Sequence, residues 1–161
     1  IRDLSSATYN TKMKLCINDN VNVASKCKGL IDILHLGQTD MDPNEAKKLI
    51  DQNIQIGLSI TNENQLGNIP NCVNYLGVGP IFPTASKIDA SEPMGSNTLK
   101  EIINKTNLPV VAIGGISIDS ICDLFKLGVS GVAVISAILN ENNPIENFQK
   151  IKENIIKGTK K

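Results

Sequence analysis

The chain has 161 residues, of which 41% are hydrophobic and 20% charged, and this composition fits one globular domain rather than a disordered chain. Its 16 basic residues balance 16 acidic ones, and aromatic residues make up 3%. We therefore expect neither nucleic acid nor a membrane surface as a partner, since these need basic or stacking aromatic side chains, whereas small phosphorylated substrates are compatible.

Short apolar runs recur along the chain, and each ends in glycine or polar residues. Runs of this length predict buried strands. In chain order the predicted strands are 14–17, 31–36, 55–60, 75–79, 110–113 and 131–135. Helical signals lie between most of them. The stretch 62–74 holds Gly67 and Pro70, so it predicts a short or broken helix.

The predicted helices have capping residues at Asp42, Ser96, Ser117 and Asn143. Asp42 precedes a proline and stands three residues before Glu45, which is typical of a helix N-terminus. The helix after Ser117 is predicted to end at Gly128. The predicted inner side of the last helix consists of Ile145, Phe148, Ile151 and Ile155.

Strands that alternate with helices predict right-handed βαβ units and a parallel sheet. Two architectures satisfy this α/β pattern, an open doubly wound sheet and a closed (β/α)8 barrel. No GxGxxG motif follows the first strand, which argues against a dinucleotide site. We expect a single domain over 1–161, because no linker or repeat interrupts the chain.

The four cysteines form no CxxC pair, which indicates reduced thiols in a cytoplasmic protein. No apolar run approaches the roughly 18 residues of a membrane span. We therefore expect neither a membrane helix nor a signal peptide.

In either architecture, ligands bind beyond the carboxyl ends of the strands. Asp19 and Asp40 follow the first two predicted strands and could face each other across one edge. Two carboxylates so placed repel each other unless a cation lies between them, and oxygen ligands favour Mg²⁺. The alternative is that each aspartate caps the helix that follows it.

Two later turns suit a phosphate group. Gly114-Gly115 follows the fifth predicted strand, and Ser136 follows the sixth. Glycines let the backbone approach a phosphate closely, and amides at a helix start point toward it. The alternative is an ordinary tight turn.

The long segment from Phe82 to Gly95 holds Thr84, Ser86 and Lys87, and loops of this length often form lids. Lys87 could bring a positive charge to a phosphate, or it could simply be a solvated lysine. His35, the one histidine, lies within an apolar strand, where we favour a hydrogen-bonded core histidine over a general base.

An ordered set of motifs resembles the thiamine-phosphate synthase family. The matching stretches are 17–19, 35–40, 57–59, 77–84, 86–87, 89–90, 110–116 and 132–138. One such motif would be weak, but the set in this order is specific. The resemblance implies a (β/α)8 barrel and a transferase that joins an aminopyrimidine-methyl diphosphate to a thiazole phosphate, with release of pyrophosphate.

The resemblance also implies roles for individual residues. Asp19 and Asp40 would hold Mg²⁺ on the diphosphate. Asn18, Ser59 and Lys87 would contact the pyrimidine substrate and act in catalysis. The thiazole phosphate would be held by Thr84, Ser86, Gly115, Ile135 and Ser136. The resemblance also implies a dissociative reaction, in which the diphosphate leaves before the thiazole nitrogen attacks. Such a reaction needs charge stabilisation of the leaving group more than a general base.

The N-terminal part of the chain departs from the family pattern. In the family, a strand and a helix come first, and a second strand then carries a Gln, an Arg and a Lys that bind the diphosphate. Only Ile1–Ser5 resembles the end of that stretch, with Arg2 in the place of one basic residue and a shortened helix over about 5–11. We therefore expect an incomplete barrel of about six strands, truncated at its N-terminus. Such a barrel could form a homo-oligomer or be completed by an N-terminal segment.

Two alternatives to the synthase remain at this stage. A related thiazole tautomerase would place a catalytic histidine after the strand 75–79, where this chain has Pro80. A non-catalytic relative would bind thiazole phosphate without joining it to the diphosphate.

Overall fold

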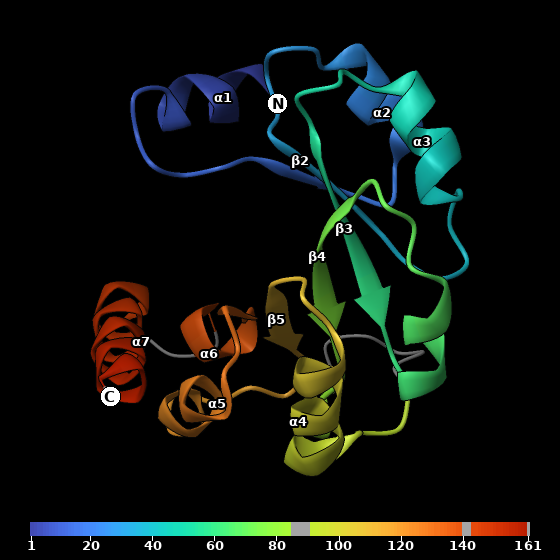
Figure 1. Cartoon of the computed structure of the whole chain (residues 1–161). Coiled ribbons are helices and arrows are strands. Elements are labelled where there is room, and N and C mark those ends of the chain that lie inside the picture. Colours follow the sequence, from blue (N-terminus) through green and yellow to red (C-terminus); the bar gives the residue numbers. More distant parts are fainter. Residues whose placement is uncertain (85–90, 140–142, 161) are drawn as a thin grey trace. The chain divides into compact units, whose positions relative to one another are not determined.

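The computed structural model describes residues 1–84, 91–139 and 143–160. The described elements are α1 (Arg2–Thr8), β1 (Cys16–Asn18), α2 (Val21–Lys26), β2 (Ile33–Leu36), α3 (Pro43–Leu49), β3 (Gln55–Ile60), the 3-10 helix η1 (Glu63–Asn68), β4 (Val73–Val78), α4 (Gly95–Lys105), β5 (Val110–Ile113), α5 (Ile121–Leu127), β6 (Gly131–Ala133), α6 (Ser136–Leu139) and α7 (Pro144–Thr159). Figure 1 labels most of these elements along the chain.

The six described strands form one sheet in the order β1-β2-β3-β4-β5-β6. A doubly wound sheet reverses its strand order at a switch point, whereas a barrel adds each new strand beside the last. The sequential order therefore selects the barrel-type topology. All six predicted strands are present, and those at 55–60 and 110–113 have the predicted bounds.

The chain divides into two compact units, residues 1–59 with 68–76, and residues 60–67 with 77–161. We call them unit 1 and unit 2 and describe each by itself. The prediction of a single domain stays a prediction.

The core of unit 1 lies between its strands and helices α2 and α3, which pack side by side (Figure 1). Alternate residues of β2 and β3 are buried on this side: Leu34, Leu36, Ile56 and Leu58. Ala24 of α2 and Ala46 of α3 are fully buried. Small side chains at these two positions allow the helices to approach closely, so the apolar face of the sheet is covered.

The core of unit 2 is built around α4, α5 and β5. Leu99, Ile102, Ile121 and Leu124 are at most 1% exposed. Helices α5 and α7 pack closely, and a Cβ atom at Gly158 of α7 would lie 2.5 Å from the Cys122 carbonyl oxygen. Glycine at this position therefore sets how near the two helices can come.

Helix α7 begins as predicted, but its predicted inner side is wrong for two of four residues, since Ile151 is buried and Ile155 half-buried. Asn143 caps the helix, since its side chain accepts from the Glu146 N–H at 3.2 Å. Ile145 and Phe148 are 73% and 51% exposed, whereas Asn147 and Ile151 are buried. The buried stripe therefore includes a polar residue, which a count of apolar spacing could not select.

Two predicted helix caps are also wrong. Helix α4 begins at Gly95 without a side-chain cap, because the N–H groups of Met94 and Gly95 donate to the carbonyls of Pro80 and Ile81. Ser117 closes a turn with Ser120, and α5 begins only at Ile121. Gly128 ends α5 in the left-handed conformation, as predicted.

At the front of the chain, the helix predicted over about 5–11 is α1, which begins at Arg2. Arg2 therefore stands in the exposed first turn of a helix. The short helices α2 and α6 gave no clear sequence signal, and the predicted short helix within 62–74 is η1. No helix in the described ranges is long and apolar enough to cross a membrane.

Candidate functional site

The two candidate metal ligands follow two paired strands of unit 1. Asp19 comes directly after β1, and Asp40 lies in the turn after β2. Strands β1 and β2 pair in parallel, so their carboxyl ends lie at the same edge. Asp19 is exposed and has φ of 63°, and Asp40 is half-buried.

Other residues cap the helices that follow. The Asn20 side chain accepts from the Val23 N–H at 2.9 Å and caps α2. Asp42 accepts from the Asn44 N–H at 2.8 Å and caps α3. The alternative that Asp19 and Asp40 cap these helices is therefore wrong, because Asn20 and Asp42 occupy the N-cap positions.

One carboxylate is oriented by its own turn. The Gly37 N–H donates to Asp40 Oδ2 at 2.6 Å, which holds the carboxylate at the end of β2. In the described part of the chain, no three His, Cys, Asp or Glu residues cluster as a metal site. Two carboxylates suit Mg²⁺, which takes its remaining ligands from water and from substrate phosphates. The donor chemistry thus fits this cation.

A second group of polar side chains lies on the sheet face opposite the apolar core of unit 1. The strand register places Asn18, His35 and Gly57 in one row. Ser59 stands two residues beyond Gly57, so its side chain lies on the same face. The Ser59 carbonyl accepts from Gln38 Nε2 at 2.7 Å, which ties the turn after β2 to β3.

His35 is hydrogen-bonded at both ring nitrogens. Its Nδ1 lies 2.8 Å from the Tyr75 hydroxyl, and its Nε2 lies 3.0 Å from Ser59 Oγ. Burial lowers the pKa of His35, with a smaller opposing effect from the charge of Asp40. Burial, followed by the neighbouring Cys16, raises the pKa of Tyr75. These shifts favour a neutral imidazole at His35 and a protonated phenol at Tyr75. The two hydrogen bonds confirm the prediction of a hydrogen-bonded histidine.

The glycine turn after β5 lies directly against the segment after β4, within unit 2. Gly114 and Gly115 have φ of 89° and 65°. The Phe82 N–H donates to the Gly114 carbonyl at 3.1 Å, and a Cβ atom on Gly115 would lie 2.4 Å from the Pro83 carbonyl oxygen. Both backbone angle and space therefore require glycine at 115.

The turn after β6 lies beside this glycine turn, because β5 and β6 pair in parallel. Ile135 is 63% exposed, and Ser136 begins α6. Backbone amides of two neighbouring turns can hold an anion. Thr84 is half-buried in the segment after β4, while Ser86 and Lys87 lie outside the described residues.

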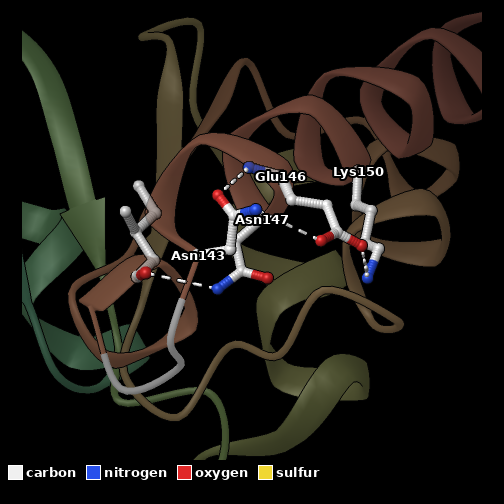
Figure 2. A network of polar contacts seen from close by, with 5 residues as sticks. Asn143, Glu146, Asn147 and Lys150 are labelled. Atoms are coloured by element: carbon white, nitrogen blue, oxygen red, sulfur yellow. Dashed lines mark hydrogen bonds and ion pairs between the residues drawn. The ribbon is translucent and has the colours of Figure 1, made fainter.

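Helix α7 supports both turns through side-chain amides. Asn147 Nδ2 donates to the Ile138 carbonyl of α6 at 3.3 Å, as Figure 2 shows, and Asn154 Nδ2 donates to the Ile118 carbonyl at 2.9 Å. Asn147 is 2% exposed. Helix α7 therefore holds in place the backbone that follows Gly115 and the backbone that follows Ser136. Sequence reasoning missed both asparagines, because no local signal identifies the partners of a buried amide.

We expect Asn147→Leu to lower the free energy of unfolding by about 1–3 kcal/mol, because the half-buried Ile138 carbonyl loses its partner. Urea denaturation followed by circular dichroism measures this change. Lys150→Gln is the matched control on the same helix, since Lys150 pairs with Glu146 at 2.8 Å on an exposed face (Figure 2). An equal loss in both variants would contradict the supporting role of Asn147.

Comparison with known proteins identifies the family. The family model for thiamine monophosphate synthase matches residues 1–138. A thiamine-phosphate synthase of Lactococcus lactis subsp. lactis is 38% identical over 153 residues, which make up 94% of this chain and 70% of that protein. The chain belongs to the thiamine monophosphate synthase family.

Two further relatives agree with this assignment. The thiamine-phosphate synthase of Vibrio parahaemolyticus is 42% identical over 135 residues, 83% of this chain and 65% of that protein. The structure of thiamine phosphate pyrophosphorylase from Pyrococcus furiosus has a TM-score of 0.87 and 29% identity, and the match covers 99% of this chain and 75% of that one.

Membership of the thiamine monophosphate synthase family confirms the predicted family and enzyme class, a transferase of thiamine phosphate synthesis. It also confirms the fold class, a barrel-type α/β fold with six strands among the described residues. The tautomerase alternative is not favoured by these relatives.

Proposed function

We propose that this chain joins an aminopyrimidine-methyl diphosphate to a thiazole phosphate and releases pyrophosphate. The observation that carries the proposal is the pair of aspartates at the ends of β1 and β2. Asn20 and Asp42 cap the following helices, so Asp19 and Asp40 are not needed there. Among members of this family, such a pair suits a metal-bound diphosphate.

In the first step, the bond between the pyrimidine methyl carbon and the diphosphate oxygen breaks, and its electron pair leaves with pyrophosphate. Asp19 and Asp40 would hold Mg²⁺, which supplies charge neutralisation for the leaving diphosphate. We assign Arg2 to the diphosphate group and Lys87 to the pyrimidine substrate. Lys87 lies outside the described residues.

Asn18 and Ser59 are the residues we assign to the pyrimidine ring. Both belong to unit 1, and their side chains lie on the polar face of the sheet beside His35. The amide of Asn18 and the hydroxyl of Ser59 can hydrogen-bond to ring nitrogens and to the amino group. These contacts would hold the ring while positive charge develops on the methyl carbon.

In the second step, the thiazole nitrogen gives its lone pair to the methyl carbon, and a carbon–nitrogen bond forms. We assign the thiazole phosphate to unit 2, at the turns after β5 and β6. The residues proposed to hold it are Thr84, Ser86, Gly115, Ile135 and Ser136. The close backbone approach that Gly115 permits supports this assignment.

We further propose a cytoplasmic location, which the four free cysteines support. We predict that the chain forms a homo-oligomer or that an N-terminal segment completes the sheet. Exposed apolar side chains of unit 2 outside the proposed phosphate site support a contact between copies, namely Leu139, Ile145 and Phe148.

Pyrophosphate release by the purified chain tests the proposed function. We expect release only when both substrates and Mg²⁺ are present, and its loss on addition of a chelator. Restoration by excess Mg²⁺ is the control for damage by the chelator. Calorimetry separates the non-catalytic alternative, which would bind thiazole phosphate without binding the diphosphate. Release that persists without any divalent cation would contradict the metal assignment.

A further inference from the structure

Three side chains from three different strands form a continuous hydrogen-bonded row in unit 1. Tyr75 of β4 lies 2.8 Å from His35 Nδ1, and His35 Nε2 of β2 lies 3.0 Å from Ser59 Oγ of β3. The rings of His35 and Tyr75 have centroids 5.4 Å apart. Ser59 is the member of this row that we assign to the pyrimidine ring.

The position of each proton in this row follows from the chemistry of its groups. A neutral imidazole has one N–H donor and one bare nitrogen acceptor. The Tyr75 hydroxyl also neighbours the Cys16 thiol, which is only a weak donor and acceptor; when the phenol, the better donor, donates to Nδ1, the ring proton stays on Nε2. The Nε2–H then donates to Ser59 Oγ. The hydroxyl proton of Ser59 is left to point toward another acceptor.

We propose that His35 is a positioning residue that aims the hydroxyl proton of Ser59 at a ring nitrogen of the aminopyrimidine substrate. The ring nitrogens of an aminopyrimidine are acceptors, whereas its amino group is a donor. A serine that accepts from Nε2–H and donates its own proton to a ring nitrogen therefore selects one edge of the ring. This inference rests on the proposed function, from which it takes its substrate.

Gly57 makes the row possible. A Cβ atom at this position would lie 2.4 Å from His35 Nδ1 and 2.2 Å from Tyr75 Cζ. The strand register places Gly57 directly beside His35, so any side chain there would occupy the space in which the two rings meet. The glycine is thus needed for contact between His35 and Tyr75 rather than for a turn.

The protonated ring nitrogen can be observed directly, because His35 is the only histidine of the chain. In a chain labelled with nitrogen-15 histidine, long-range proton–nitrogen correlation spectra should show one imidazole with its proton on Nε2. Tyr75→Phe should give a mixture of both tautomers. Tyr9→Phe is the matched control, since Tyr9 is 76% exposed. A proton on Nδ1 in the unaltered chain would overturn the proposal.

Kinetics test whether His35 acts through Ser59. We expect His35→Asn, whose shorter side chain cannot reach Ser59, to raise KM for the pyrimidine diphosphate about tenfold, as for one lost hydrogen bond. KM for the thiazole phosphate should stay within about twofold, which general damage to the fold would not allow. His35→Gln, whose amide nitrogen can reach Ser59, should restore part of the loss.

The double variant His35→Asn/Ser59→Ala should be no worse than Ser59→Ala alone, because both changes remove the same contact. Additive losses would overturn the positioning role. If the unaltered chain fails to join the two substrates, the proposed function fails. The tautomer measurement and calorimetric binding of the pyrimidine diphosphate still decide the role of His35.

Discussion

Replacing Asp40 by asparagine should lower kcat/KM for pyrophosphate release by about 100-fold to 1000-fold, and Asp19→Asn should do the same. Asparagine keeps the size of the side chain but removes the charge that would hold Mg²⁺ on the leaving group. Its carbonyl oxygen can still accept from the Gly37 N–H, so the turn after β2 should be preserved. Activity measured over a range of Mg²⁺ concentrations checks the prediction.

The response to Mg²⁺ distinguishes a ligand from a merely structural carboxylate. A lost ligand should raise the concentration of Mg²⁺ that gives half-maximal activity, and excess Mg²⁺ should recover part of the rate. Asp123→Asn is the matched control, since the Asp123 side chain is 80% exposed on α5 and pairs at the surface with Lys126. Wild-type activity in Asp40→Asn would show that Asp40 is not a ligand of the metal.

Gly115→Ala should raise KM for the thiazole phosphate more than tenfold and lower the free energy of unfolding by more than about 2 kcal/mol. The added Cβ atom would lie 2.4 Å from the Pro83 carbonyl oxygen and 2.6 Å from that of Phe82. Backbone atoms cannot move aside as a flexible side chain does. The turn after β5 must therefore separate from the segment after β4. Steady-state kinetics with each substrate varied in turn, together with urea denaturation, measure both effects.

Gly29→Ala separates backbone strain from loss of space. Gly29 has φ of 71°, close to the 65° of Gly115, but a Cβ atom added at Gly29 would meet no heavy atom within 4 Å. We expect this control to lose about 1–2 kcal/mol of stability and no affinity for the thiazole phosphate. If the two variants behave alike, the close approach at Gly115 has no part in binding.

Local signals in the sequence were sufficient for much of the fold. The apolar runs at 55–60 and 110–113 gave strands with the observed bounds, since polar residues follow the first run, and Pro109 and Gly114 flank the second. Asp42 and Asn143 were correctly identified as caps, because a cap bonds within its own first turn. Ser96 was not a cap, because contacts with a distant segment set the start of α4.

For the site, motif order alone was enough to name the family and to select Asp19, Asp40 and Gly115 as candidates. The sequence could not decide whether the aspartates cap helices, since a cap shifted by one or two residues gives almost the same pattern. The pairing of Tyr75 with His35, and the need for glycine at 57, depended on strand register. Register joins residues about 20 to 40 positions apart, and only the tertiary structure brings them together.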